Sequence, residues 1–131
     1  MKTTKIIAFS IAMAVAATSG TAMAKSKGAK LFKRKCKTCH SLEVGKHKIG
    51  PSLHGVVGRQ AGTAEGYTKY KAMKGAKFTW DEEKLASWIT NQKKFLKAHK
   101  DVVGGQSTAM SAKIKKEKDR KAIIEYLKTG K

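Results

Sequence analysis

The chain has 131 residues and carries 29 Lys and Arg against 9 Asp and Glu, a formal charge of +20 at pH 7. This length suits one domain, and 40% hydrophobic residues with only 7% aromatics indicate a globular chain with a thin apolar core. Two cysteines exclude a multi-bridge disulfide scaffold, and the single proline excludes a collagen-like or proline-rich chain. We therefore expect one small globular domain whose thin apolar core needs an additional apolar component.

Residues 1–24 have the pattern of a secretory signal peptide. Two lysines precede an apolar run over residues 6–17, and small residues end the segment at Ala24. An uncleaved membrane anchor is the alternative, but the run is shorter than the roughly 20 residues that span a bilayer. The sequence thus predicts cleavage after Ala24, a mature domain over residues 25–131, and a soluble protein exported to a bacterial periplasm.

The rest of the chain has the pattern of helices separated by loops. Residues 29–35 place Leu31 and Phe32 on one side of a short amphipathic helix. Glycines recur throughout residues 41–66 and break every helical period, so a long loop region is expected there. A loop of this length needs a body to wrap around.

Two more helices are predicted in the second half. Thr79 with Glu82 three residues later has the form of a capping box, and apolar residues then recur at helical spacing as far as Leu96. Residues 97–107 are polar and contain glycines, so they are expected to be irregular, and residues 118–128 form the last amphipathic helix. No alternating strand pattern and no internal repeat is present, so the predicted fold class is all-α.

The segment Cys36-Lys37-Thr38-Cys39-His40 carries the chemistry. Two thiols separated by two residues and followed at once by histidine have the spacing of covalent haem c attachment. On one helical turn both thiols face the same side and each can form a thioether with a haem vinyl group, while His40 reaches the iron. The sequence thus predicts one haem c, bound covalently through Cys36 and Cys39.

Three other uses of the two thiols remain as alternatives. A zinc site needs four ligands, and the chain has no second cysteine pair, so histidines elsewhere would complete an odd set. A thioredoxin-like redox pair needs a βαβ setting that the helical pattern does not supply. A structural disulfide between Cys36 and Cys39 suits an oxidising compartment but leaves His40 unexplained.

A second axial ligand is expected opposite His40. The candidates are Met73, Met110, His47, His54 and His99. Met110 is favoured because it lies in the irregular stretch before the last helix and has small neighbours on both sides. A thioether ligand raises the reduction potential, and a filled sixth position leaves no place for a substrate on the iron. The pattern therefore predicts an electron-transfer protein and not an enzyme.

Further residues along the chain belong to one pattern. They are Gly28 and Phe32, then Gly50-Pro51-Ser52-Leu53-His54-Gly55-Val56-Val57-Gly58-Arg59, Ala61-Gly62, Gly66-Tyr67, Thr79-Trp80 and residues 123–127. With them, the chain from Gly28 to Leu127 resembles the class I, mitochondrial-type cytochromes c, including their soluble bacterial members. The resemblance implies three to five helices with long loops wrapped around one haem.

The resemblance also implies roles for individual residues. The Pro51 carbonyl should accept a hydrogen bond from the His40 ring, and Arg59 and Trp80 should meet the haem propionates with Thr108 as a further donor. The crossing of the first and last helices should be formed by Gly28, Phe32, Ile123 and Tyr126. Because the haem supplies a large apolar body, we expect the chain without it to be poorly folded.

Four positions depart from that family pattern. The stretch between Leu96 and Thr108 is about nine residues longer than in short members. The aromatic that often follows the axial methionine is absent. The usual tyrosine donor to a propionate aligns with Lys69, with Tyr70 one residue away. Trp88 replaces a tyrosine that commonly packs near the methionine, which puts the hydrogen bond of that tyrosine in question.

The basic side chains are mostly lysines and flank the chemistry. Residues 33–37 surround the attachment segment, and residues 113–118 follow Met110. Such a field predicts fast, salt-sensitive docking on acidic surfaces of redox partners, such as a cytochrome bc complex, a terminal oxidase, a reductase or a photosynthetic reaction centre. We expect a monomer with no nucleic-acid partner and at most peripheral membrane contact. A haem enzyme or gas sensor with an open iron site, and a thiol redox protein, are the competing hypotheses.

Overall fold

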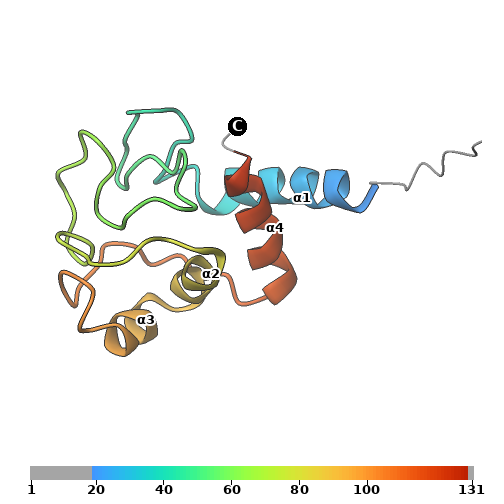
Figure 1. Cartoon of the computed structure of the whole chain (residues 1–131). Coiled ribbons are helices and arrows are strands. Elements are labelled where there is room, and N and C mark those ends of the chain that lie inside the picture. Colours follow the sequence, from blue (N-terminus) through green and yellow to red (C-terminus); the bar gives the residue numbers. More distant parts are fainter. Residues whose placement is uncertain (1–18, 130–131) are drawn as a thin grey trace, which may run out of the picture.

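The computed structural model describes residues 19–129, which contain four helices (Figure 1). The helices are α1 Ser19–Lys35, α2 Glu82–Thr90, α3 Gln92–Ala98 and α4 Glu117–Lys128. Within the described residues, the β structure is limited to one isolated bridge between Gln60 and Thr79. The predicted all-α class is confirmed. The helix expected over residues 29–35 is part of α1, which begins at Ser19.

The crossing of α1 and α4 joins the two ends of the described chain (Figure 1). A Cβ atom built on Gly28 would lie 2.1 Å from the Ala122 carbonyl oxygen, so only glycine permits this close approach. Phe32 packs on Tyr126 with ring centroids 5.6 Å apart, and Ile123 is 1% exposed. The predicted crossing is therefore present with the expected residues.

A long loop region connects α1 to α2, as the glycine pattern predicts (Figure 1, cyan to yellow). Backbone hydrogen bonds tie the middle of this region to its end near α2. The Trp80 amide donates to the Arg59 carbonyl at 2.9 Å, and the Ala61 amide donates to the Phe78 carbonyl at 2.9 Å. These bonds close residues 59–80 into a loop ring that forms one side of the molecule (Figure 1).

The helix predicted to run from the Thr79 region to Leu96 is interrupted at Asn91. The backbone of Asn91 is extended (φ −163°, ψ 103°), its amide ends α2 on the Ser87 carbonyl, and its side chain caps α3 by accepting from the Lys94 amide. Asparagine satisfies exposed amides better than it propagates a helix. The prediction of one continuous helix was therefore wrong at this residue.

The capping residue of α2 also differs from the prediction. Asp81 accepts a hydrogen bond from the Lys84 amide at 2.7 Å, whereas Thr79 belongs to the bridge with Gln60. The nearby Lys84 lowers the pKa of the Asp81 carboxyl. Aspartate caps a helix as well as threonine does and also interacts favourably with the helix dipole, which explains the later start.

The stretch over residues 97–107 was expected to be irregular throughout, but Lys97 and Ala98 belong to the end of α3. Residues 99–107 are irregular and are braced against residues 71–77. The Gly104 amide donates to the Ala72 carbonyl at 2.7 Å, and the Lys77 amide donates to the Val102 carbonyl at 2.7 Å. A Cβ atom on Gly104 would lie 1.6 Å from the Lys74 carbonyl oxygen. The extension thus forms a fixed support ahead of Met110.

The predicted leader falls mostly outside the described residues, which begin at Ser19. Residues 19–24 form the first part of α1, and the helix continues without a break past Ala24. The domain boundary after Ala24 stays a prediction. Among the described helices, none combines the length and apolar character that crossing a membrane requires.

Candidate cofactor site

One cavity of about 240 Å³ lies between the helices and the loop ring. Its walls are mainly apolar, and Val56, Leu85 and Ile123 contribute to them. The eight residues that the sequence assigned to cofactor binding all line it, and they are Cys36, Cys39, His40, Pro51, Arg59, Trp80, Thr108 and Met110. The fold therefore brings segments from both halves of the chain to one place.

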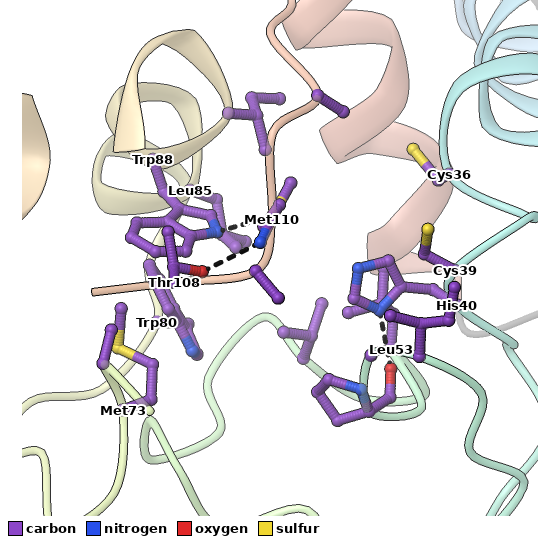
Figure 2. A pocket seen from close by; sticks show the side chains of 18 of the residues that line it. Cys36, Cys39, His40, Leu53, Met73, Trp80, Leu85, Trp88, Thr108 and Met110 are labelled. Atoms are coloured by element: carbon purple, nitrogen blue, oxygen red, sulfur yellow. Dashed lines mark hydrogen bonds between the residues drawn. The ribbon is translucent and has the colours of Figure 1, made fainter. Parts of the chain in front are cut away.

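The cysteine wall of the cavity is a continuation of α1. The Cys36 amide donates to the Phe32 carbonyl at 2.8 Å, and the His40 amide donates to the Cys36 carbonyl at 2.9 Å. This turn places the two sulfur atoms and the imidazole along one side of the cavity (Figure 2). Both thiols are unpaired and half-buried, and burial, with a smaller contribution from Cys39, raises the pKa of Cys36 to about 11.

The ring of His40 is held from behind. Its Nδ1 lies 2.8 Å from the Pro51 carbonyl oxygen (Figure 2), so Nδ1 carries the proton and donates, and Nε2 keeps its lone pair. Burial lowers the pKa of His40, and the nearby Arg59 and Lys48 add to this, although the bond to Pro51 opposes it. The imidazole is therefore neutral and oriented, as a metal ligand must be.

Gly50 allows the loop to pass directly over this ring. A Cβ atom at Gly50 would lie 2.3 Å from His40 Cε1, far inside van der Waals contact. The backbone φ of Gly50 is not positive, so the requirement for glycine here is one of space. The sequence Gly50-Pro51 thus provides both the clearance and the hydrogen-bond acceptor for the ring.

Met110 lies across the cavity from His40 (Figure 2). The Trp88 indole nitrogen donates to the Met110 sulfur at 3.1 Å, and the Met110 amide donates to the Thr108 hydroxyl at 3.1 Å. Met73 also touches the cavity but is buried on the far side of Trp80. The other candidate ligands, His47, His54 and His99, do not line the cavity.

Arg59 and Trp80 meet at the tied ends of the loop ring. The Arg59 guanidinium donates to the His54 carbonyl at 2.9 Å and to the Ser52 carbonyl at 3.0 Å. Burial lowers the pKa of Arg59, and Tyr70 partly opposes this. Trp80 is 7% exposed, so its ring is part of the inner wall. These contacts give the floor of the cavity a fixed cation beside an apolar wall.

Two neighbouring residues, Lys69 and Tyr70, are the alternatives for the propionate donor, and they differ in burial. Both line the cavity, but Lys69 is exposed while Tyr70 is half-buried. The Tyr70 hydroxyl accepts from the Ala64 amide at 3.0 Å, and its ring packs edge-on against Tyr67 with centroids 4.8 Å apart. Tyr70 therefore occupies the more fixed position.

Sequence reasoning missed two contacts behind Met110. It left the hydrogen bond of the tyrosine replaced by Trp88 in question, yet the indole N–H reaches the Met110 sulfur. It assigned no role to Gln92, yet the Gln92 amide donates to the Ala112 carbonyl at 2.7 Å. Buried indole and amide N–H groups need an acceptor, and this requirement is the signal that could have revealed both.

The donor set fits a haem c. One wall offers two thiols for thioether bonds and an imidazole with a free Nε2, the facing wall offers a thioether sulfur, and apolar residues line the space between. No group of three or more metal-ligating His, Cys, Asp or Glu side chains occurs in the described part of the chain. The predicted haem c therefore has its attachment points in place.

Comparison with known proteins gives a consistent result. A family model described as Cytochrome c matches residues 26–131. The chain is 41% identical over 104 residues to the cytochrome c of Kluyveromyces lactis, covering 79% of this chain and 87% of that one. It is 42% identical over 103 residues to that of Gibberella zeae (78% and 90%), and 41% identical over 104 residues to that of Chlamydomonas reinhardtii (79% and 86%).

The predicted periplasmic location is contradicted by these relatives. They are eukaryotic, mitochondrial-type cytochromes c of yeast, fungi, plants and algae, and not periplasmic bacterial proteins. The prediction depended on residues 1–24, and residues 1–18 lie outside the described part of the chain. A short apolar run after two lysines is a weak signal for export to the periplasm. The folded domain offers no second signal, because nothing in it specifies a compartment.

Gly50→Ala tests the support of the His40 ring. Since the added methyl group overlaps the ring, we expect the hydrogen bond to the Pro51 carbonyl to lengthen and the His40 Nδ1–H proton resonance to shift in the NMR spectrum of the reduced, haem-bearing protein. Gly45→Ala is the control: a Cβ there meets open space, and its positive φ makes that variant strained as well. If the His40 Nδ1–H resonance had the same chemical shift in the Gly50→Ala and Gly45→Ala variants, the assigned contact would be contradicted.

Proposed function

Since this chain belongs to the cytochrome c family, and so carries electrons on one haem c bound through Cys36 and Cys39, we propose that His40 and Met110 are its axial iron ligands. The observation that carries the proposal is the position of the His40 imidazole and the Met110 sulfur on facing walls of one cavity. The bound haem supplies a metal that changes its charge by one electron. The residues around it set the potential and control access.

His40 has the protonation state that iron ligation needs. Its Nδ1–H is committed to the Pro51 carbonyl, which leaves Nε2 as the only nitrogen able to bind a metal. The same bond increases the basicity of Nε2 and prevents rotation of the ring. Both effects favour a ligand that does not move when the iron changes its oxidation state.

Met110 lies on the cavity wall opposite His40 (Figure 2). As an iron ligand, a soft thioether would stabilise ferrous iron and raise the potential, and it would leave no coordination position for oxygen, peroxide or another substrate. The Trp88 N–H withdraws electron density from the same sulfur. The proposed pair therefore suits electron transfer, whereas a haem enzyme or gas sensor requires an open position on the iron.

Polar groups at the cavity floor are proposed to meet the propionates. Arg59 supplies a half-buried positive charge, and Trp80, Thr108 and Tyr70 supply N–H or O–H donors around the same cavity. Burying a carboxylate is costly unless charge and hydrogen bonds compensate. Tyr70 takes this role rather than Lys69, because its half-buried ring is already fixed against Tyr67.

Lysines at the mouth of the cavity are proposed to guide partner docking. Lys35, Lys69 and Lys71 line its edge, all three are exposed, and Lys37 and Lys113 follow Cys36 and Met110 in the sequence. A field of one sign raises association rates with acidic surfaces and weakens with salt. The partners proposed are redox proteins with acidic docking faces, which this chain contacts transiently.

Met110→Leu tests the ligation. We expect the variant to lose the weak long-wavelength absorption band of a sulfur-ligated ferric haem and to bind carbon monoxide in the ferrous form at neutral pH, because the sixth position becomes open. Met73→Leu removes the other buried methionine of the cavity and should retain the band and resist carbon monoxide. Loss of the band in Met73→Leu with its retention in Met110→Leu would reverse the assignment.

Trp88→Phe tests the second contact of the sulfur. Without the N–H donor the thioether becomes a stronger donor to ferric iron, so the reduction potential should fall by about 20 to 60 mV, since a hydrogen bond contributes roughly 0.5 to 1.5 kcal/mol and 59 mV corresponds to a factor of ten for one electron. Redox titration measures the change. Trp88→Tyr keeps a hydrogen-bond donor, so its reduction potential should lie between those of Trp88→Phe and the unaltered protein. An unchanged or higher potential in Trp88→Phe would contradict the contact.

A further inference from the structure

The segment that carries Met110 has little backbone support of its own. In the described structure, residues 106–113 take part in no backbone–backbone hydrogen bond. The segment is anchored before it by the Gly104 and Gly105 amides, which donate to the Ala72 carbonyl, and after it by the Ile114 amide, which donates to the Ile89 carbonyl at 2.7 Å. Side chains must therefore hold the part in between.

Gln92 provides one of these side-chain contacts from inside the molecule. It is the first residue of α3 and only 2% exposed, and its Nε2 donates to the Ala112 carbonyl at 2.7 Å. Ala112 lies two residues beyond the sulfur-bearing Met110. A buried glutamine is unusual because its polar group must be satisfied inside the protein, so this position has a specific use for the amide.

The kink at Asn91 explains how the amide reaches its acceptor. Because α2 ends at Thr90 and α3 begins at Gln92, the side chain of Gln92 leaves the corner of the two helices toward the segment that follows Met110. At the same corner Trp88 donates to the Met110 sulfur and Ile89 accepts from the Ile114 amide. Three contacts thus join one corner to residues 110, 112 and 114.

We propose that Gln92 is a positioning residue for the iron ligand: its amide holds the Ala112 carbonyl and so keeps the Met110 segment closed over the cavity. This inference rests on the proposed ligation by Met110. Detachment of the sulfur requires the segment to lift, which exposes the Ala112 carbonyl to water. The hydrogen bond then exists only in the closed state, and its loss shifts the balance toward the open state.

The test is the binding of imidazole to the ferric, haem-bearing protein. Imidazole takes the position of Met110 only in the open state, so its apparent affinity reports the population of that state. Gln92→Met keeps the length of the side chain and its preference for helix but cannot donate. We expect it to lower the apparent dissociation constant of imidazole about tenfold, while the long-wavelength band is retained without imidazole.

Gln60→Met is the control for the loss of an amide-to-carbonyl hydrogen bond at an exposed position. The Gln60 amide also donates to a backbone carbonyl, that of Ala76 at 3.3 Å, but it belongs to the loop ring and not to the helix corner behind Met110. It should leave the imidazole affinity within twofold of the unaltered protein. Gln92→Glu, which places a carboxylate against the Ala112 carbonyl, should strengthen imidazole binding at neutral pH as Gln92→Met does.

Each outcome decides a different point. Unchanged imidazole affinity in Gln92→Met, with only a lower unfolding temperature, would overturn the positioning role. Equal increases in the Gln92 and Gln60 variants would overturn it too, because general loosening would explain both. Failure of both Gln92 variants to mature with haem would assign Gln92 to folding and not to ligand positioning. Absence of the long-wavelength band in the unaltered protein would instead refute the proposed ligation by Met110.

Discussion

The structure depends on a body that fills the space between the helices and the loop ring. About a third of the chain, from the end of α1 to the start of α2, has no helix or strand and makes mostly short-range turns. Such a segment gains too little from its own contacts to offset the entropy of ordering it. A covalently attached haem supplies the apolar surface against which these loops become fixed, and this explains why a small chain with few aromatic residues can fold.

Two sets of contacts hold the walls of the cavity. On one side a single turn after α1 carries both thiols and His40, and Pro51 fixes the ring from the next part of the loop. On the other side the corner between α2 and α3 holds the Met110 segment through side chains. The first wall is set by local sequence, whereas the second is assembled from elements far apart in the chain. The second wall is therefore the one expected to open.

Much of this arrangement could be predicted from the sequence where a residue type has one physical use. The spacing of Cys36, Cys39 and His40 indicated the haem. The resemblance to the class I cytochromes c, and not the residue type alone, implied that Gly28 lies at a close helix crossing, which the structure contains. Met110 was chosen over the other candidates, and the structure has it on the wall that faces His40 (Figure 2), although its ligation remains a proposal.

What could not be predicted depends on tertiary context. Asn91 has a helical neighbour on each side, and only the packing of the two short helices shows that its side chain caps the second. Asp81 and Thr79 both suit the start of α2, and the pairing of Thr79 with Gln60 decides between them. The acceptors of Trp88 and Gln92 lie about 20 residues away in sequence. The compartment was predicted wrongly because its only signal lay outside the folded domain.

Circular dichroism of the Cys36→Ala, Cys39→Ala double variant, which cannot attach the haem, tests the central claim most directly. If the haem is the body around which the loops are ordered, the variant should have much less helix than the mature protein and should unfold without a cooperative transition. Native helix content with a cooperative transition in the colourless variant would contradict the account.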